Sequence, residues 1–353
     1  MHPAQVDIRT PHATGAWHAL ADQVLGGRKA THEQALDILR APDSELLDLL
    51  SAAFRVREAA FGRTVQLYVL MNVRSGLCPE DCSYCSQSRA SKADVQKYPL
   101  VAADIILEGA ENAAKWGACT FCVVASGRAP GQRDLQHLGN VVREVKSRYS
   151  LRICACLGLL TEEQALFLKE AGVDRVNHNL NTSQKFYPKV CSTHTYEDRL
   201  KTLENVRAAG ISQCSGCIIG MGESDDDVVW VAEQLRDLNV DSIPVNFLHA
   251  IEGTPLEHTW NLNPQACLKA LCMFRFVNPG AEIRMAGGRE LHLGALQPLG
   301  LYPANSLFLG DYLTTKGQRP EQDLKMIRDL GFRVTPPQPC PEDQAGAAIA
   351  SNG

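Results

Sequence analysis

Short apolar runs alternate with longer amphipathic segments along most of the chain. Runs rich in Val and Ile predict strands, whereas apolar positions three and four residues apart predict helices. The strands are expected at 65–73, 119–125, 151–157, 174–180, 212–219, 242–248, 281–286 and 306–309. The helices are expected at 104–116, 134–147, 161–171, 195–209, 225–237, 264–277, 289–297 and 321–330. Eight strand-then-helix units favour a parallel (β/α)8 barrel of the TIM type, which is an α/β fold. A doubly wound open sheet is the alternative, because periodicity does not show closure.

The two ends of the chain differ from this repeating part. The expected organisation is a flexible N-terminus at 1–30, a barrel domain at 31–335 and a proline-rich, disordered tail at 336–353. The barrel domain begins with a helical leader at about 32–60, which we expect to pack on the outer or bottom surface of the barrel. The leucines that give this leader its helical spacing are Leu36, Leu39, Leu46, Leu47 and Leu50.

Composition and charge exclude several classes of protein. The 353 residues carry a net charge of −5 and no basic block. The chain therefore lacks the clustered positive charge that is typical of nucleic-acid-binding proteins. No apolar stretch is long enough for a membrane span and no signal-peptide core is present, so we expect a cytoplasmic protein. Thirteen cysteines are an odd number. In a reducing compartment they favour metal ligation over disulfides. Cys340 lies in the tail and is excluded as a ligand.

Three cysteines lie within the eight residues from Cys78 to Cys85, directly after the first expected strand. The sequence there is Cys78-Pro79-Glu80-Asp81-Cys82-Ser83-Tyr84-Cys85. Ferredoxins hold each iron of a [4Fe-4S] cluster with a cysteine, so three local thiolates leave one iron open. Loops that follow strands open onto the catalytic face of a barrel. A structural zinc knot, or an electron-transfer cluster completed by a distant cysteine, is the alternative interpretation of this spacing.

The C-x3-C-x2-C spacing, with Tyr84 before the last cysteine, resembles the signature of the radical S-adenosylmethionine (SAM) superfamily. The resemblance implies that Cys78, Cys82 and Cys85 hold a [4Fe-4S] cluster whose open iron binds the methionine part of SAM. One electron then breaks a C–S bond and releases a 5′-deoxyadenosyl radical. A reducing flavodoxin- or ferredoxin-type donor is the partner that this chemistry implies.

A second group of unusual residues lies in the expected strands, where a barrel core would prefer Val or Leu. Its members are Cys119, Cys122, Cys154, Cys156, Cys214, Cys217 and Arg284. Strand alternation places Cys119 and Cys122 on opposite faces, and likewise Cys214 and Cys217, whereas Cys154 and Cys156 share a face. Each cysteine alone is more simply a small buried hydrophobe. A buried arginine needs an acceptor or an anion, and no acidic residue in the core of its strand plainly supplies one.

Seven segments resemble the biotin synthase family of this superfamily, from about residue 40 to 333. They are 76–85 (with the three cysteines), 177–183 (Asn-His-Asn-Leu-Asn-Thr-Ser), 193–199 (Thr-His-Thr-Tyr-Glu-Asp-Arg), 214–216, 245–246, 253–256 and 284–290. The resemblance implies a second, [2Fe-2S] cluster deep in the barrel, with Cys122, Cys154, Cys214 and Arg284 as its ligands. The Leu-Gly after the strand-three cysteine aligns Cys154 with the family and leaves Cys156 as a neighbour without an assigned role.

The family resemblance also implies the reaction. Biotin synthases insert sulfur into dethiobiotin with two SAM molecules per biotin, one for each C–H bond broken, and are therefore sulfurtransferases. A homodimer is the family expectation. A sulfide already in contact with the substrate carbon, inside a dry cavity, is what this chemistry requires. Cys78, Cys82, Cys85 and Arg284 are the residues expected to be catalytic.

The family motifs further imply binding residues. The residues expected to bind SAM are Tyr84, Ala125, Asn179, Asn181 and Arg199, and those expected to bind dethiobiotin are Asn177, Asn179 and Asn246. Some family members carry aspartate where this chain has Asn181. The structural alternatives are a surface helix partner for Arg199 and a strand-end amide for Asn246. His178, between two inward asparagines, is expected to point away as a satisfied structural histidine.

Two other functions remain open on the sequence. One is another radical SAM enzyme on the same barrel, such as a relative that makes methylornithine or a hydrogenase-cofactor precursor. The barrel cysteines together with Arg284 count against it. The other is a non-enzymatic iron–sulfur carrier, which should show a fourth local cysteine or compact two-cluster spacing. The acidic run at 223–227 is interpreted as a charged helix N-terminus and not as a metal site.

Overall fold

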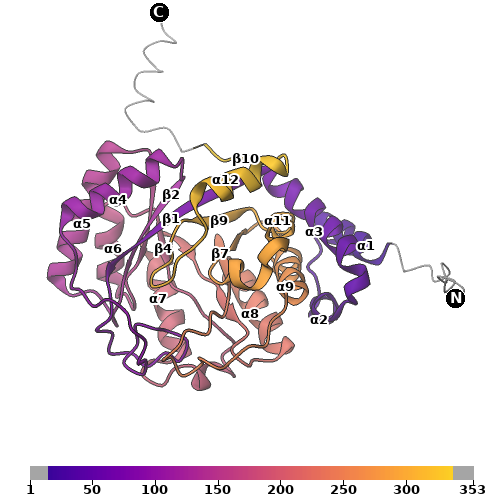
Figure 1. Cartoon of the computed structure of the whole chain (residues 1–353), viewed down its shortest axis with the longest axis horizontal. Helices are drawn as coiled ribbons and strands as arrows, with labels where there is room; N and C mark the ends of the chain where they lie inside the picture. Colours follow the sequence, from indigo (N-terminus) through magenta and orange to yellow (C-terminus); the bar gives the residue numbers. More distant parts are fainter. Residues whose placement is uncertain (1–14, 337–353) are drawn as a thin grey trace, which may run out of the picture.

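A closed parallel barrel forms the centre of the protein, as a computed structural model of residues 15–336 shows (Figure 1). Strand β1 (Thr64–Arg74) pairs with β2 (Thr120–Ala125) on one side and with β9 (Ser306–Leu309) on the other. This second pairing closes the sheet and excludes the doubly wound alternative. The (β/α)8 prediction is confirmed.

All eight expected strands are present. The remaining ones are β3 (Arg152–Cys156), β4 (Arg175–Asn177), β5 (Ser212–Cys214), β6 (Cys217–Ile219), β7 (Ser242–Phe247) and β8 (Glu282–Met285). Strands β5 and β6 are one expected strand that is interrupted at Ser215-Gly216. A short tenth strand, β10 (Arg333–Val334), pairs with the beginning of β1 and was not predicted.

Helices surround the barrel at nearly the predicted positions. They are α4 (Ala103–Lys115), α5 (Gln132–Arg148), α6 (Glu162–Glu170), α7 (Tyr196–Ala208), α8 (Asp225–Asp237), α9 (Pro264–Val277), α10 (Arg289–Leu293), α11 (Gln297–Gly300) and α12 (Pro320–Asp329). The expected helix at 289–297 is divided between α10 and α11 by a 3₁₀ turn, η3 (Gly294–Leu296). Thr161 and Ser224 each close a capping box, which confirms that the acidic run at 223–227 begins a helix.

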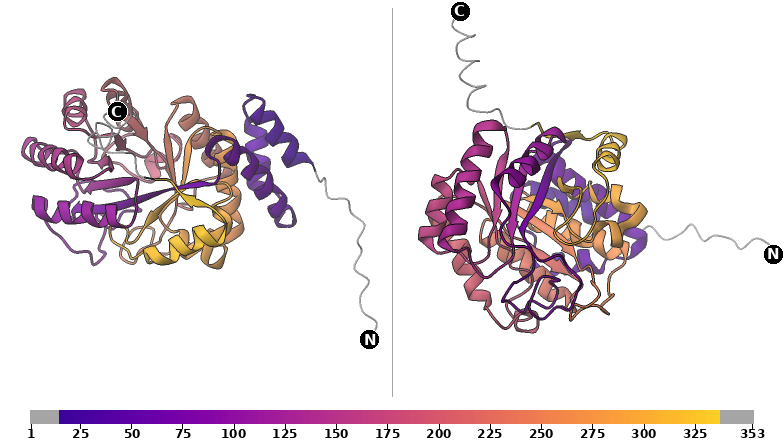
Figure 2. Two further views of the ribbon diagram at one scale, coloured as in Figure 1. Left: turned by 90° about the horizontal axis from the view of Figure 1, so that it is seen from above. Right: turned by 60° about the vertical axis from the view of Figure 1, so that its left-hand side comes forward.

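The helical leader packs outside the barrel, against α9 and α8 (Figure 2). It consists of α1 (Ala16–Leu25), α2 (His32–Arg40), the 3₁₀ turn η1 (Asp43–Glu45) and α3 (Leu46–Phe61). Helix α1 corrects the expectation of a flexible segment at 1–30, since Trp17 and Leu20 are buried within it. Leu47 also differs from the prediction. It lies on the outer face of α3 and is 71% exposed, whereas Leu46 and Leu50 are buried.

The ends of the chain lie outside the described residues. The expectations for residues 1–14, for the tail from 337 onward and for Cys340 therefore stay predictions. Among residues 15–336, no helix is long and apolar enough to cross a membrane.

The strands separate the core between strands and helices from the interior of the barrel. Val65, Leu67 and Val69 of β1 point outward into the core between strands and helices, while Tyr68 packs with Cys122 and Cys154 inside the barrel. The long segment from the end of β1 to the start of α4 carries the three-cysteine motif and crosses the lower left of Figure 1. It lies at the carboxyl ends of the strands, where TIM barrels place their active sites.

Candidate active site

One cavity of about 410 Å³ runs from the three-cysteine loop into the barrel. It is lined by nearly all the residues that the sequence singled out: Cys78, Cys82, Tyr84, Cys85, Cys122, Ala125, Cys154, Asn177, Asn179, Asn181, Arg199, Asn246 and Arg284. Cys214 lies just behind the wall and is fully buried. Its sulfur is 3.2 Å from Nδ2 of Asn177 and 3.8 Å from Nη1 of Arg284.

The outer end of the cavity holds Cys78, Cys82 and Cys85 on one short loop. The Cys85 N–H donates to the Cys82 carbonyl at 3.1 Å, so a tight turn brings these cysteines together. Burial raises the pKa of Cys78 and of Cys85, as expected for thiols in an apolar wall. A bound metal reverses this effect because it stabilises the thiolate. Three inward-facing soft ligands on one loop fit an iron–sulfur cluster.

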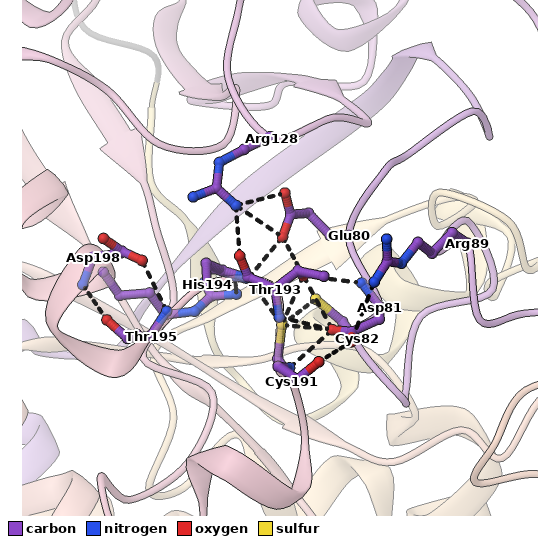
Figure 3. A network of polar contacts seen from close by, with 12 residues as sticks. Glu80, Asp81, Cys82, Arg89, Arg128, Cys191, Thr193, His194, Thr195 and Asp198 are labelled. Atoms are coloured by element: carbon purple, nitrogen blue, oxygen red, sulfur yellow. Dashed lines mark hydrogen bonds and ion pairs between the residues drawn. The ribbon is translucent and has the colours of Figure 1, made fainter.

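Two acidic side chains fasten the cysteine loop to residues 190–194 (Figure 3). Asp81 accepts hydrogen bonds from the backbone N–H groups of Ser192 at 2.9 Å and Thr193 at 3.2 Å. Glu80 accepts from the Thr193 hydroxyl and pairs with Arg128 at 3.1 Å. Arg128 also donates to the Thr193 carbonyl at 2.7 Å. The loop geometry is thus fixed by contacts that reach across more than a hundred residues of sequence.

Cys191 and His194 stand beside the cysteine motif, and sequence reasoning did not identify them as part of the outer site. The Cys191 sulfur is 3.7 Å from that of Cys82 and 2.9 Å from Nδ1 of His194. One sulfur or ring-nitrogen atom from each of these residues lies within 4.8 Å of the others, which is the spacing of a metal site. The Cys-x2-His spacing at 191–194 is the sequence signal that could have pointed to them.

The hydrogen bonds around Cys191 shift the pKa values of Cys191 and Cys82 in opposite directions. The hydrogen bond from Cys82 lowers the pKa of Cys191 to about 4, and that from His194 acts in the same direction. The same bond to Cys191, together with burial, raises the pKa of Cys82. Arg199 donates to Nε2 of His194 at 2.9 Å, so the neutral ring carries its proton on Nδ1. His194 therefore donates toward Cys191 and toward Glu80, which is 2.9 Å away.

Arg199 points into the cavity and not to solvent, which rules out the surface alternative. It is 7% exposed, and its three nitrogens contact the Tyr187 hydroxyl, the Asn179 carbonyl at 2.7 Å and His194. Burial lowers its pKa, but Tyr84, Tyr187 and Cys82 outweigh that effect and raise it. Arg199 is a fixed cation at the outer end of the cavity.

The asparagines form a chain of amides along one wall. Asn177 donates to Oδ1 of Asn179 at 2.9 Å, and Asn179 also accepts from the backbone N–H of Gly216 at 3.1 Å. Asn181 donates to the Tyr84 hydroxyl at 2.7 Å and adopts a left-handed backbone conformation (φ 69°), which asparagine tolerates better than most residues. These bonds orient the amides toward the cavity from fixed positions.

Two residues of the wall differ from simple expectation. Asn246 bonds to the Cys217 carbonyl and to the Gly287 N–H, both at 3.0 Å, so it does connect strands as the structural alternative holds. His178 borders the cavity although it was expected to point away. Strand β4 ends at Asn177, so alternation does not extend to it. Its Nε2 atom has no hydrogen-bond partner among the described residues, so it is not a satisfied structural histidine.

Ala125, which is expected to bind SAM, is the last residue of β2. The segment that follows it is held by Arg74, whose Nε donates to the Ser126 carbonyl at 2.6 Å. Gly127 has φ 134°, and a Cβ there would lie 2.5 Å from Nη2 of Arg74. Only glycine fits this turn without displacing Arg74.

The inner end of the cavity holds the other three cysteines. Cys122 of β2 stands directly opposite Cys154 of β3 in the register, and Cys214 lies beyond β4. A hydrogen bond with Cys122 and burial raise the pKa of Cys154, and burial raises that of Cys214. Cys156 shares the cavity wall two residues along the strand, and burial raises its pKa to about 12.

Four other cysteines do not line the cavity. Cys119 precedes β2 and packs with Tyr68, Cys122 and Cys154, so the parity prediction that it faces away from Cys122 is wrong, although it does not line the cavity. Its sulfur donates to the Leu67 carbonyl. Cys217 belongs to the core outside the barrel. The alternation argument for Cys214 and Cys217 did not apply, because the two lie on separate strands, although its outcome agrees with the structure. Cys267 and Cys272 are buried in α9.

Arg284 has an acidic partner within its own strand, contrary to the sequence interpretation. Nη2 of Arg284 is 2.6 Å from Glu282, which also pairs with Arg175 at 2.9 Å and accepts from the Tyr68 hydroxyl at 2.7 Å. Alternation puts residues 282 and 284 on one face, so the carboxylate lies one layer below the guanidinium. Burial lowers the pKa of Arg284, but Tyr68, Glu282 and Cys214 raise it well above its ordinary value.

The other edge of Arg284 is free for a ligand. Its Nε has no hydrogen-bond partner among the described residues, and Nη1 has only the Cys214 sulfur. An unpaired buried polar atom is costly, so this edge is suited to a further group in the cavity. Three thiols and this edge together fit a [2Fe-2S] cluster.

We expect Glu282→Gln to lower the free energy of unfolding by about 3 kcal/mol, because it leaves two buried arginines without their anion. Burial raises the pKa of Glu282, but Arg284 and Arg175 hold it well below the ordinary range. Its stabilisation is therefore present above the unfolded-state pKa of about 4.3 and is lost as pH falls below it. Denaturant titrations at neutral and acidic pH measure the effect.

The matched control for this prediction is Glu204→Gln, because Glu204 is 64% exposed on α7 and its ion pair is worth little. We expect the difference between wild type and Glu282→Gln to narrow toward pH 3. Equal stability of both variants at neutral pH contradicts the role of Glu282.

The chain is similar to known proteins over most of its length. Residues 72–235 match the radical SAM superfamily and residues 244–333 match the Biotin and Thiamin Synthesis associated domain. A biotin synthase of Rhodopirellula baltica is 59% identical over 91% of this chain and 89% of its own length. A biotin synthase of Geobacillus kaustophilus is 54% identical over 94% of this chain and 98% of its own length.

Solved structures share the fold at much lower identity. Methylornithine synthase superposes with a TM-score of 0.78 at 20% identity, covering 90% of this chain and 97% of that one. An FeFe-hydrogenase maturase of Carboxydothermus hydrogenoformans has a TM-score of 0.78 at 16% identity, covering 92% and 80%. At these identities the likeness extends to the fold alone, so the alternative functions gain no support from it.

Proposed function

The chain belongs to the biotin synthase family, and from this membership and the cavity we propose how its residues divide the work of inserting sulfur into dethiobiotin. The enzyme is a sulfurtransferase that uses SAM, a [4Fe-4S] cluster and a [2Fe-2S] cluster. The observation that carries the division of roles is a single cavity with Cys78, Cys82 and Cys85 at one end and Cys122 and Cys154 at the other, where Cys214 lies just behind the wall. Dethiobiotin turnover in the reconstituted enzyme, with iron and sulfide counted, tests the proposal.

The outer end binds and orients SAM. Cys78, Cys82 and Cys85 would hold the [4Fe-4S] cluster, which supplies the electron that cleaves SAM. Arg199 presents a cation for the SAM carboxylate without moving, since Tyr187 and His194 already hold it. Asn181 offers an amide and Tyr84 a hydroxyl for the ribose, and the turn after Ala125 offers backbone groups.

The inner end provides the sulfur position. Cys122, Cys154, Cys214 and Arg284 would hold the [2Fe-2S] cluster, which supplies the sulfide that becomes part of the product. Glu282 favours the charged form of Arg284, so this residue is a weak and easily replaced ligand. The asparagines Asn177, Asn179 and Asn246 line the same cavity and would bind dethiobiotin there. Fixed amides orient the substrate and reduce the entropy lost at the reacting carbon.

We expect Arg284→Met to assemble an inner cluster with altered spectra and to retain part of its activity. The reason is that three thiolates remain, while the positive charge next to Cys214 is lost. Visible absorption and Mössbauer spectra of the anaerobic protein measure the change. Arg175→Met is the matched control, because it removes an equal charge from Glu282. Spectra of Arg284→Met that match wild type, or that match Arg175→Met, contradict direct contact of Arg284 with the cluster.

Three finer features rest on the family rather than on the cavity. We propose a flavodoxin- or ferredoxin-type protein as electron donor, a homodimer as the assembly and the cytoplasm as the compartment. Thirteen cysteines, suited to metal ligation in a reducing environment, support the last of these. Turnover with each purified donor, size-exclusion chromatography with light scattering, and cell fractionation test them separately.

A further inference from the structure

We propose that Cys191 is a resolving cysteine, which forms a reversible disulfide with Cys82 when an oxidant removes the outer cluster. The proposal concerns cysteine chemistry in the chain and does not depend on the substrate. Cys82 lines the cavity, whereas Cys191 lies behind it and is 5% exposed. Figure 3 shows the two sulfurs side by side, one on each of the fastened segments.

The two sulfurs are already close. Their separation of 3.7 Å is that of an S–H···S hydrogen bond, and a disulfide needs about 2.05 Å. Side-chain rotation supplies most of such a change when the backbone is close. The backbone is close here, because the Ser83 N–H donates to the Val190 carbonyl at 2.9 Å.

The surrounding contacts hold this arrangement whether or not the sulfurs are joined. Asp81 binds the N–H groups at 192 and 193, and the Glu80 carboxylate contacts His194 and Arg128. None of these contacts uses the Cys82 sulfur. The cysteines therefore remain neighbours after the cluster is lost, which favours their reaction with each other over reaction with a third thiol.

The oxidation balances with hydrogen peroxide as the oxidant. A cysteine that ligates iron is deprotonated, so departure of the iron leaves Cys82 as a thiolate. This thiolate attacks one peroxide oxygen, the O–O bond breaks, and sulfenic acid and hydroxide form. The Cys191 thiolate then attacks the Cys82 sulfur, the S–O bond breaks, and hydroxide leaves. Overall, two thiols and one peroxide give one disulfide and two waters. A sulfenic acid without a resolving thiol proceeds to sulfinic acid, which ordinary thiol reductants do not restore.

The test starts from the holoenzyme. It is treated with hydrogen peroxide, free thiols are alkylated, and the non-reduced digest is analysed by mass spectrometry. We expect a cross-linked peptide pair containing Cys82 and Cys191 that disappears on reduction. In Cys191→Ser we expect Cys82 sulfinic acid instead, and a loss of cluster recovery after reduction and reconstitution with iron and sulfide.

A matched control and a measurement on wild type keep the proposal falsifiable. Cys217→Ser removes a buried cysteine from the core away from the cysteine loop, and we expect it to recover its cluster like wild type. If Cys191→Ser assembles no cluster, the peptide map of the wild-type chain alone decides. Absence of the Cys82–Cys191 peptide, pairing of Cys82 with Cys78 or Cys85 instead, or equal recovery in Cys191→Ser overturns the proposal.

Discussion

Replacing Cys78 by alanine is expected to lower 5′-deoxyadenosine formation at least about 100-fold, because even outer-shell partners of a metal site cost about 10- to 100-fold. Cys78 and Cys85 are the informative positions. At Cys82 the neighbouring sulfur of Cys191, 3.7 Å away, could take over the ligand position and hide the effect. The measurement is deoxyadenosine released per chain with SAM and a chemical reductant, which bypasses any protein donor.

The same replacement should leave the fold intact, since the loop is fastened through Glu80 and Asp81 and not through its sulfurs. Cys267→Ala is the control for removal of a buried thiol, because Cys267 lies in α9 away from the cavity. Normal SAM cleavage by Cys78→Ala, or by Cys85→Ala, removes these residues from the cluster.

Replacing Cys154 by serine is expected to abolish biotin formation while SAM cleavage continues. The two ends of the cavity carry separate thiol sets, so loss of the inner set leaves the outer set in place. Cys156→Ser is the matched variant, two residues along the same strand and on the same face, and it should retain the inner cluster. Inner-cluster content, biotin per chain and deoxyadenosine per chain are measured on each.

Two outcomes of this pair are informative, and so is one outcome of the serine variants at Cys122, Cys154 and Cys214. If Cys154→Ser loses the inner cluster and biotin formation while Cys156→Ser keeps both, the result supports Cys122, Cys154 and Cys214 as the ligand set. The reverse result moves the ligand two residues along β3. Retention of the cluster in serine variants of all three positions contradicts an inner sulfur source in this cavity.

The barrel could be predicted because its signal is local. Each strand is a short apolar run and each helix an amphipathic one, so neighbouring residues reveal them. Helix α1 was not predicted, because its apolar side chains, among them Trp17 and Leu20, are buried only by packing against α3. Closure of the sheet into a barrel could be seen only in the structure, because it depends on the pairing of β1 with β9, which joins the two ends of the sheet.

The site was also predictable only where its signal is local. Motifs identified the cysteines and asparagines, which the structure brings to one cavity. The partners that hold them were not predictable, because they come from distant positions. Glu282 was overlooked although it is two residues from Arg284, since its role depends on Arg175 and Tyr68 from other strands. No motif marked Cys191 as part of the outer site, and only the folded chain shows it beside Cys82.

The Cys156 thiol on the cavity wall matters when a carbon radical forms but no sulfur is inserted. With its pKa raised to about 12 it keeps its hydrogen at neutral pH. An S–H bond is weaker than an alkyl C–H bond, so a carbon radical that touches this sulfur takes the hydrogen and becomes closed-shell again. The unpaired electron then rests on sulfur and not on backbone or substrate. Cys156 is thus a thiol hydrogen donor on the wall of the cavity in which the reaction would form carbon radicals.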